Sequence, residues 1–288
     1  MRILILGGDG MLGHQLLKHF APRHDVRATL RLPLHQYSNF AGFDATNAYG
    51  GIELRSIDPL IAVLGDLRPE VVINAAGIVK QRPTAEEAIP SLEINALLPH
   101  RLAVLCKAIG ARLVHISTDC VFSGRKGAYR ESDLADADDL YGRTKYLGEV
   151  HEPNCVTLRT SMIGPELSRK TGLLEWFLGQ HGTIRGYRNA IFSGFTTIEL
   201  ARIIEILLTR FPSASGLYHV SSAPISKLDL LTLLKQRMGL AVEITPYDNF
   251  RCDRSLTSSR FQSEFGYRPP EWPDMVNELA TQLLGMPR

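Results

Sequence analysis

The chain has 288 residues, 44% hydrophobic and 22% charged, an ordinary composition for a globular protein with a sizeable core. Its formal net charge of +2 is too small to favour nucleic acid or an anionic membrane surface as a partner. No apolar stretch approaches the roughly 18 residues of a membrane span, and no secretory signal is apparent, so we expect a cytoplasmic protein.

The cysteines and histidines give no sign of a metal site or a disulfide framework. Four cysteines are scattered without a CxxC pair, which is typical of free thiols in a reducing compartment. His14, His19 and His24 recur every five residues and cannot share one helix face as metal ligands would. We therefore expect no bound metal.

Along the first 160 residues, short aliphatic runs alternate with longer helical patterns. Strands are expected at 2–6, 25–30, 70–74, 112–117 and 155–158, and helices at 11–20, 59–67, 85–109 and 140–150. Strands that are apolar throughout and alternate with helices are typical of a parallel sheet covered on both faces. The sequence thus predicts an α/β fold with a doubly wound, Rossmann-type parallel sheet.

The pattern changes after about residue 160, where Gly, Arg and Pro become frequent. Segments 179–189 and 247–255 are expected as loops, whereas a helix at 196–208 and a strand near 217–220 are expected to rejoin the main sheet. We therefore predict a Rossmann domain at 1–160, with 193–222 rejoining it. A smaller substrate-binding region is predicted at 161–192 and 223–288.

A glycine-rich turn, GGDGMLG, follows the first predicted strand directly. Gly7 would allow the tight turn, Gly10 the close approach of a pyrophosphate, and Gly13 the packing of the next helix on the sheet. The helix start would then offer N–H groups and a partial positive charge to the diphosphate. The alternative is a tight turn with no ligand. The predicted cofactor-binding residues of this turn are Gly7, Asp9, Gly10, Met11, Leu12 and Gly13.

The end of the second strand bears on which dinucleotide binds. A site for NAD usually has an Asp or Glu there, but residues 26–35 (VRATLRLPLH) contain no carboxylate. Thr29 and Arg31 stand there instead, and an arginine can bind a 2′-phosphate through paired hydrogen bonds. The sequence therefore favours NADP(H) over NAD(H), unless Arg31 is simply a solvated loop residue.

A second constellation combines a strand end with a helix. Thr118 ends a predicted buried strand, and Tyr141 and Lys145 lie four residues apart, on one face of a predicted helix. A tyrosine phenol ordinarily keeps its proton until a pH of about 10. A neighbouring lysine cation favours the phenolate and so makes the phenol a better proton donor and acceptor near neutral pH. Thr118 could hold a substrate carbonyl by a hydrogen bond.

With these motifs in place, the chain resembles the extended short-chain dehydrogenases/reductases, and among them the dTDP-4-dehydrorhamnose reductase family. The matching stretches run through the chain and include VVINAAG at 71–77, HISTDCVFSG at 115–124, YGRTKYLGE at 141–149 and LRTSMIG at 158–164. The resemblance implies NADPH-dependent reduction of a nucleotide-linked 4-keto-6-deoxy sugar in deoxysugar biosynthesis. It also implies that Thr118, Tyr141 and Lys145 are catalytic.

The resemblance extends to binding residues. It implies that Lys145 also holds the nicotinamide ribose and that the cofactor is lined by Asn74, Ala75, Ala76 and Asn95. The substrate-binding residues that we predict are Asp119, Cys120, Met162, Arg188 and Arg254. Met162 stands where the family often has tryptophan, and Arg254-Ser255 replaces an Arg-Pro pair. The resemblance therefore does not determine which sugar is bound.

Three readings of the function remain at this point. Related 4,6-dehydratases carry Asp-Glu after the active-site threonine, whereas this chain has Asp119-Cys120, which favours carbonyl reduction. A nucleotide-sugar epimerase would keep the same residues but return the hydride. A non-catalytic NADP-binding regulatory subunit is the third reading. The expected partner is a nucleotide sugar, without nucleic acid or membrane, and a homodimer is left open.

Overall fold

The structure is a computed structural model that describes residues 1–40, 42–79, 87–168 and 170–285. The chain divides into two compact units. Unit 1 comprises residues 1–117, 138–158 and 204–217, and unit 2 comprises 118–137, 159–203 and 218–288. The predicted domain boundaries, at 160, 193 and 222, stay a prediction beside this division.

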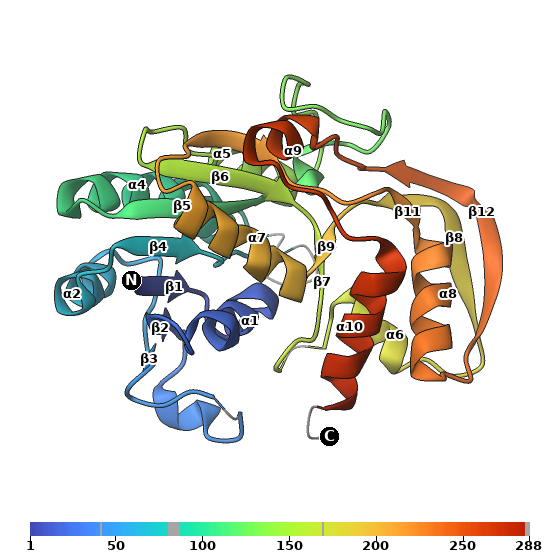
Figure 1. The fold of residues 1–288 in the computed structure, drawn as a ribbon, viewed down its shortest axis with the longest axis horizontal. Coiled ribbons are helices and arrows are strands. Elements are labelled where there is room, and N and C mark those ends of the chain that lie inside the picture. The colour runs from blue at the N-terminus through green and yellow to red at the C-terminus, as the bar shows by residue number, and fades with distance from the viewer. Residues whose placement is uncertain (41, 80–86, 169, 286–288) are drawn as a thin grey trace. The chain divides into compact units, whose positions relative to one another are not determined.

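Strands and helices alternate through the first part of the chain (Figure 1). They are β1 (Arg2–Leu6), α1 (Met11–Phe20), β2 (Asp25–Thr29), the 3-10 turn η1 (Leu34–Tyr37), β3 (Ala48–Tyr49), α2 (Asp58–Leu67), β4 (Val71–Asn74), α3 (Ala88–Ser91), the π-helical segment η3 (Leu92–Leu97), α4 (Leu98–Ile109), β5 (Arg112–Thr118), α5 (Leu140–Leu147) and β6 (Cys155–Thr160). Of the helix predicted at 85–109, residues 85 and 86 lie outside the described residues.

The described strands of the main sheet have the order β10-β6-β5-β4-β1-β2-β3. The pairs β1–β2, β1–β4, β2–β3 and β4–β5 are all parallel. The chain builds outward from β1 to β2 and β3, then returns to β4 on the other side of β1. The predicted α/β fold with a Rossmann-type parallel sheet is confirmed, and the switch point lies between β1 and β4.

The core explains why the strands of this sheet are apolar throughout. Leu4 and Leu6 of β1 pack in one cluster with Leu64 of α2 and Leu102 of α4. Ile3 and Ile5 alternate with them and are equally buried, so both faces of the strand are covered. The predicted strand at 2–6 is confirmed, and the burial of both faces explains its continuous apolar pattern.

The later elements are α7 (Thr197–Arg210) and β10 (Gly216–His219), together with those of unit 2. As predicted, a strand late in the chain, β10, joins the main sheet. In unit 2 the structure has the 3-10 turn η4 (Asp119–Val121), β7 (Met162–Ile163), α6 (Leu173–Leu178), β8 (Thr183–Phe192), β9 (Phe195–Thr196), β11 (Ile225–Ser226), α8 (Lys227–Met238), β12 (Glu243–Asp253), α9 (Ser259–Phe265) and α10 (Trp272–Leu284).

Two loop predictions were wrong. Most of 179–189 belongs to β8 and most of 247–255 to β12, and these two strands pair in parallel beside α8 (Figure 1). Along β8, exposed arginines and an asparagine alternate with buried positions, which are Ile184, Gly186, Ala190 and Phe192. Because two of these buried positions are the small residues Gly and Ala, the sequence shows no clear apolar alternation there. β12 is exposed along most of its length and has no apolar pattern to detect.

None of the helices in the described part of the chain combines the length and the apolar character needed to cross a bilayer.

Candidate active site

The turn between β1 and α1 places glycine where no side chain fits. Gly7 has φ +80°, and a Cβ there would lie 2.9 Å from the Cα of Ala76, just after β4. A Cβ on Gly13 would lie 2.0 Å from the Gly7 carbonyl oxygen. A Cβ on Gly10 would meet only that same oxygen, at 3.1 Å. The backbone at Gly10 is therefore open to the approach of a ligand.

Gly8 has a structural role that its place in the Gly-Gly doublet could have indicated. A Cβ on Gly8 would lie 2.5 Å from the Cβ of Ala28, so glycine lets the turn lie against β2. Helix α1 then begins at Met11, and within the described chain no side chain caps it and its first turn carries no acid. This helix start therefore suits an anion such as a diphosphate. Met11 is half-buried, and Leu12 is buried in the core face of α1.

The residues predicted to select the dinucleotide have different environments. The Thr29 hydroxyl accepts a hydrogen bond from the Gly7 N–H at 3.3 Å, and its carbonyl accepts one from the Gly8 N–H at 2.9 Å. Thr29 is thus buried as a support of the turn. Arg31 is exposed, and the Asp9 carboxylate accepts from the Tyr37 hydroxyl at 3.1 Å. Of Thr29 and Arg31, only Arg31 has an exposed side chain.

Asn74 ends β4 and shapes the segment that lies against the glycine turn. Its side-chain Nδ2 donates to Nδ1 of His115 at 3.1 Å, and its Oδ1 accepts from the Ala76 N–H at 3.3 Å. Burial lowers the pKa of His115 well below its usual value, so this imidazole is neutral and can accept at Nδ1. The Ala75 N–H donates to the Leu6 carbonyl at 3.2 Å. The Ala75 bond holds the ends of β1 and β4 side by side, and the Asn74–His115 bond ties β4 to β5.

Asn95 is buried and joins two segments of unit 1. Its Oδ1 accepts from the Ile78 N–H at 2.9 Å, and its Nδ2 donates to the Ile78 carbonyl at 3.0 Å and to the Thr144 hydroxyl at 3.3 Å. Thr144 belongs to α5, and a Cβ on Gly148 just beyond it would lie 1.9 Å from the Asn95 carbonyl oxygen. The predicted cofactor-lining Asn95 therefore also fixes the position of α5.

Helix α5 carries Tyr141 and Lys145 on one face, as their spacing predicted. The helix begins after Asp139, whose carboxylate accepts from the Gly142 N–H at 2.8 Å. Lys145 is buried, and its ammonium donates to the Ile116 carbonyl of β5 at 2.7 Å. Burial lowers the pKa of Lys145 to about 8, against the opposing influence of the Glu149 carboxylate. Lys145 is therefore held beside the strand that leads to Thr118.

Thr118 is the last residue of β5 and the first residue of unit 2. Its hydroxyl accepts from the Cys120 N–H at 3.1 Å and donates to the Asp119 carboxylate at 3.2 Å. Tyr141 and Lys145 belong to unit 1. The convergence of these three side chains around one carbonyl group stays a prediction.

Asp119, Cys120 and Arg254 belong to a cluster of polar groups in unit 2. Asp119 is only 8% exposed, and burial raises the pKa of its carboxyl, an effect that the charge of Arg254 opposes. Burial raises the pKa of the Cys120 thiol to about 12, so this thiol keeps its proton near neutral pH. The Arg254 Nε donates to the Phe122 carbonyl at 2.8 Å. Of the predicted substrate-binding residues, these three come together.

The other two predicted substrate-binding residues belong to strands of unit 2. Met162 is half-buried in the short strand β7. Arg188 is exposed on β8, and its Nε lies 3.0 Å from the Asp248 carboxylate in a solvent-accessible ion pair. Arg188 thus already has an anionic partner within its own chain.

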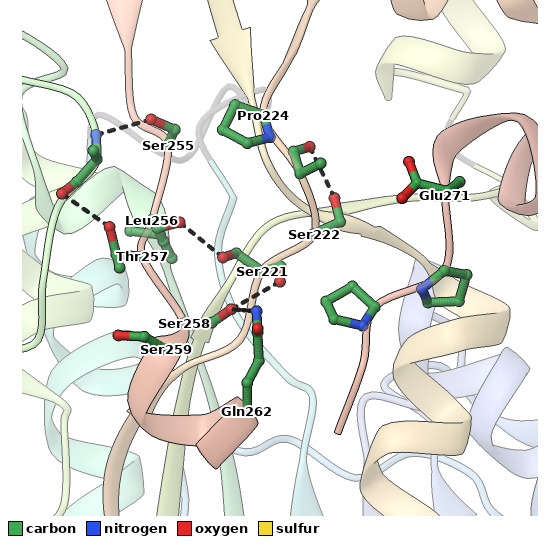
Figure 2. Close-up of a pocket in the computed structure, with 14 residues that line it drawn as sticks. Ser221, Ser222, Pro224, Ser255, Leu256, Thr257, Ser258, Ser259, Gln262 and Glu271 are labelled. Carbon is green, nitrogen blue, oxygen red and sulfur yellow. Dashed lines mark hydrogen bonds between the residues drawn. The ribbon is translucent and has the colours of Figure 1, made fainter. Parts of the chain in front are cut away.

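A cavity of about 450 Å³ in unit 2 has a lining rich in hydroxyl groups (Figure 2). Its hydroxyls are largely used within the chain: Ser221 donates to the Leu256 carbonyl at 2.8 Å, and Ser258 donates to the Ser221 carbonyl at 2.9 Å. The Gln262 amide in turn donates to the Ser258 hydroxyl at 2.8 Å. These bonds tie Ser221 to residues 256–262 and mark the lining as structural.

One cation of unit 2 did not emerge from sequence analysis. Lys227 opens α8, close enough to Asp119, Cys120 and Cys252 for their charges to interact. The available signal was a lysine directly after the N-cap serine, since a helix start disfavours positive charge.

The strand order, the glycine turn at the switch point and the Tyr-Lys pair on the helix after β5 define the class of protein. The chain has the fold of an extended short-chain dehydrogenase/reductase, and the Rossmann part carries the features of a dinucleotide site. Among the described residues, no three His, Cys, Asp or Glu side chains are grouped so that they could hold a metal ion.

The chain belongs to the family described as RmlD substrate binding domain, whose model matches residues 1–284. It is 31% identical over 229 residues to the spore coat polysaccharide biosynthesis protein SpsK of Bacillus subtilis, covering 74% of this chain and 80% of that one. It is 26% identical over 308 residues to the dTDP-4-dehydrorhamnose reductase of Salmonella typhimurium, covering 98% of both chains. A dTDP-4-dehydrorhamnose reductase of Bacillus anthracis in complex with NADP superposes with a TM-score of 0.81 at 22% identity, covering 98% of this chain and 99% of that one.

Proposed function

We propose that the protein is an NADPH-dependent reductase of a nucleotide-linked 4-keto-6-deoxy sugar in deoxysugar biosynthesis. The observation that carries the proposal is the pairing, in unit 1, of an open glycine turn with a helix whose Lys145 is anchored on the strand leading to Thr118. The names of the full-length relatives, which are dTDP-4-dehydrorhamnose reductases, support the same reaction.

The residues at the turn fit a dinucleotide. Gly10 leaves its backbone open, the start of α1 is uncapped by side chains of the described chain, and Gly7 holds the turn against Ala76. Arg31, exposed just beyond β2, would bind the 2′-phosphate that distinguishes NADP from NAD. When bound, NADPH supplies the hydride for the carbonyl carbon.

The chain's own residues would then manage the carbonyl oxygen. The Thr118 hydroxyl would exchange its hydrogen bond to the Asp119 carboxylate for one to this oxygen, and the Tyr141 phenol would donate the proton that converts the oxygen into a hydroxyl. The Lys145 ammonium, fixed by the Ile116 carbonyl, would stabilise the phenolate that remains. The reaction therefore needs no acid–base pair beyond these residues, in keeping with Asp119-Cys120 after the threonine.

A spectrophotometric assay of NADPH oxidation with dTDP-, UDP-, GDP- and CDP-linked 4-keto-6-deoxy sugars tests the proposal. We expect one nucleotide series to be reduced, with one NADPH consumed for each hydroxyl formed. A sugar product formed without net consumption of the cofactor would instead identify an epimerase. NADPH binding without turnover of any member of the panel would overturn the enzymatic function and favour a regulatory subunit.

A further inference from the structure

Lys227 occupies a position that is unfavourable for a cation. It is the first residue of α8, directly after Ser226, whose hydroxyl caps the helix by accepting from the Asp229 N–H at 3.0 Å. The positive end of the helix dipole lies at this end, so it stabilises a carboxylate such as Asp229 and destabilises an ammonium. The local sequence therefore gains nothing in helix stability from Lys227.

The surroundings of Lys227 add to this cost. The side chain is half-buried, and its Nζ lies 4.3 Å from the ring centroid of Phe192 in a cation–π contact. Among the residues that the structure describes, none accepts a hydrogen bond from this ammonium. Burial also lowers the pKa of Lys227, with smaller opposing effects from the charges of Asp119, Cys120 and Cys252. Three strong donors are thus held in a partly desolvated place without an acceptor.

Lys227, Asp119 and Arg254 come from three separate segments of unit 2, and the charges of both Lys227 and Arg254 act on Asp119. Asp119 follows directly on Thr118, Arg254 lies just after β12, and Lys227 begins α8. A Cβ on Gly124 would lie 2.7 Å from the Cys252 sulfur and 3.1 Å from the Arg254 Cγ, which shows how closely the loop after β5 meets β12. With Asp119 ionised, the cluster holds one negative charge and two positive ones. Its excess charge is positive, and it lies next to the proposed catalytic threonine.

The satisfied hydroxyls of the cavity in Figure 2 make a useful contrast. There, the serine hydroxyls donate their hydrogen bonds to carbonyl groups of the same chain, as is typical of a polar lining with a structural role. Lys227 differs: it occupies an unfavourable helix position, is partly buried and has donors without an acceptor in the described chain. This combination is typical of a functional residue.

We propose that Lys227 is a substrate-binding residue that, together with Arg254, donates hydrogen bonds to the phosphate oxygens of a glycosyl diphosphate. This inference rests on the proposed function and deepens it. The charge excess suits an anion, and the free ammonium donors supply the hydrogen bonds that phosphate oxygens accept.

Calorimetric titration of dTDP, UDP, GDP and CDP into the NADP⁺-saturated protein tests the inference. We expect Lys227→Met to weaken binding of the preferred nucleoside diphosphate by about tenfold or more. Lys227→Arg keeps the charge and should retain most of the affinity. Lys235→Met removes a lysine from the last turn of the same helix and should bind like the wild type. Affinity for NADP⁺, which probes unit 1, should be equal in all four proteins.

A thermal melt separates a binding role from a structural one. Because Lys227→Met removes a partly buried cation that no described residue satisfies, its Tm should equal or exceed that of the wild type. Unchanged affinity of Lys227→Met, absence of nucleoside diphosphate binding to the wild type, or a lowered Tm with lost NADP⁺ binding would each overturn the inference.

The outcomes also distinguish this inference from the proposed function. If the wild type reduces a ketosugar while Lys227→Met binds the diphosphate normally, the inference fails and the proposed function stands. If no ketosugar is reduced but the affinity still depends on Lys227, the phosphate-binding role stands and the reductase function fails.

Discussion

Each unit contains a buried or half-buried lysine with a proposed functional role, and the two ammonium groups differ in their hydrogen bonding. In unit 1 the ammonium of Lys145 is buried and donates to the Ile116 carbonyl at 2.7 Å. In unit 2 the ammonium of Lys227 lies over the Phe192 ring, without an acceptor among the described residues. The first lysine is positioned by its own chain before any ligand arrives. The second has donors left over, which is what binding a ligand requires.

The two lysines differ in how far the chain itself positions their ammonium groups. Unit 1 fixes its polar groups through the chain, as with Asn74, Asn95 and Lys145. In unit 2, Asp119, Arg254 and Lys227 come from separate segments of the chain, and the charges of Arg254 and Lys227 act on Asp119. We expect variants in unit 1 to affect chemistry and cofactor binding, and variants in the unit 2 cluster to affect the substrate.

The largest effect should follow from Tyr141→Phe, which removes the proposed proton donor and leaves the ring. Turnover of the ketosugar should fall by about 100-fold or more, while affinity for NADP⁺ stays unchanged. Tyr146→Phe, on the same helix but 44% exposed, should retain wild-type turnover. Stopped-flow measurement of NADPH oxidation checks both variants. A Tyr141→Phe enzyme with nearly full turnover would end the assignment of catalysis to unit 1.

The next largest effect is the contribution of Lys145 to the pH dependence of the protein's folding stability. Its pKa is about 8 in the folded protein, below the ordinary value of 10.5, so the unfolded chain holds more protons between these two pH values. Stability relative to Lys145→Met should therefore rise with pH across this interval, by up to about 3 kcal/mol. Denaturant unfolding of both proteins at pH 7.5 and pH 10 measures the change. A constant difference would show that Lys145 is not desolvated as described.

Gly13→Ala should disturb unit 1 next most strongly. The added methyl group would collide with the Gly7 carbonyl, so the free energy of unfolding should fall by about 1–3 kcal/mol and NADPH binding should weaken. Gly65→Ala is the matched control, since a Cβ there would meet no described heavy atom within 4 Å inside α2. That variant should gain about 0.5–1 kcal/mol. Equal stability of the two variants would mean that the turn adapts.

The smallest effect should come from Asp119→Asn in unit 2. Because burial raises the pKa of this carboxyl, the folded protein holds the proton more tightly than the unfolded chain does, and stability is lost as pH rises through that interval. The variant should therefore have an equal or higher Tm at pH 7, with the difference closing on acidification.

Asp133→Asn supplies a control of opposite sign for this last prediction. The Lys126 ammonium and the Arg130 N–H lower the pKa of the Asp133 carboxyl. Its contribution to stability should be present at pH 7 and lost on acidification, so the variant should melt below the wild type at neutral pH. If both aspartate variants shift Tm in the same direction at pH 7, the opposite pKa shifts assigned to the Asp119 and Asp133 carboxyls are wrong.

The sequence predicted most of unit 1 because its elements are locally determined. The strand at 2–6 is apolar throughout since both of its faces are buried, and the helix at 11–20 starts at a glycine turn. Spacing alone was enough to place Tyr141 and Lys145 on one face of α5. In each case the signal and the structure involve residues close together in the chain.

The rest depends on long-range contacts that spacing does not encode. β12 is exposed along most of its length, so its pairing with β8 is not foreshadowed by a hydrophobic pattern. The neighbours of Lys227 come from the loop after β5 and the end of β12, which only the tertiary structure brings together. The Thr29 hydroxyl accepts from the Gly7 N–H, a support of the turn that sequence spacing did not indicate, and its cofactor-binding role remains a prediction. The cofactor-binding role of its neighbours remains a prediction.

The position of β10 at one end of the main sheet has a consequence for biosynthesis. β10 pairs with β6, although residues 161–215 of the chain lie between the end of β6 at Thr160 and the start of β10 at Gly216. During translation, β6 therefore presents an unpaired edge until residue 219 has left the ribosome. A nascent chain stalled before that point should be prone to aggregation and should depend on chaperones.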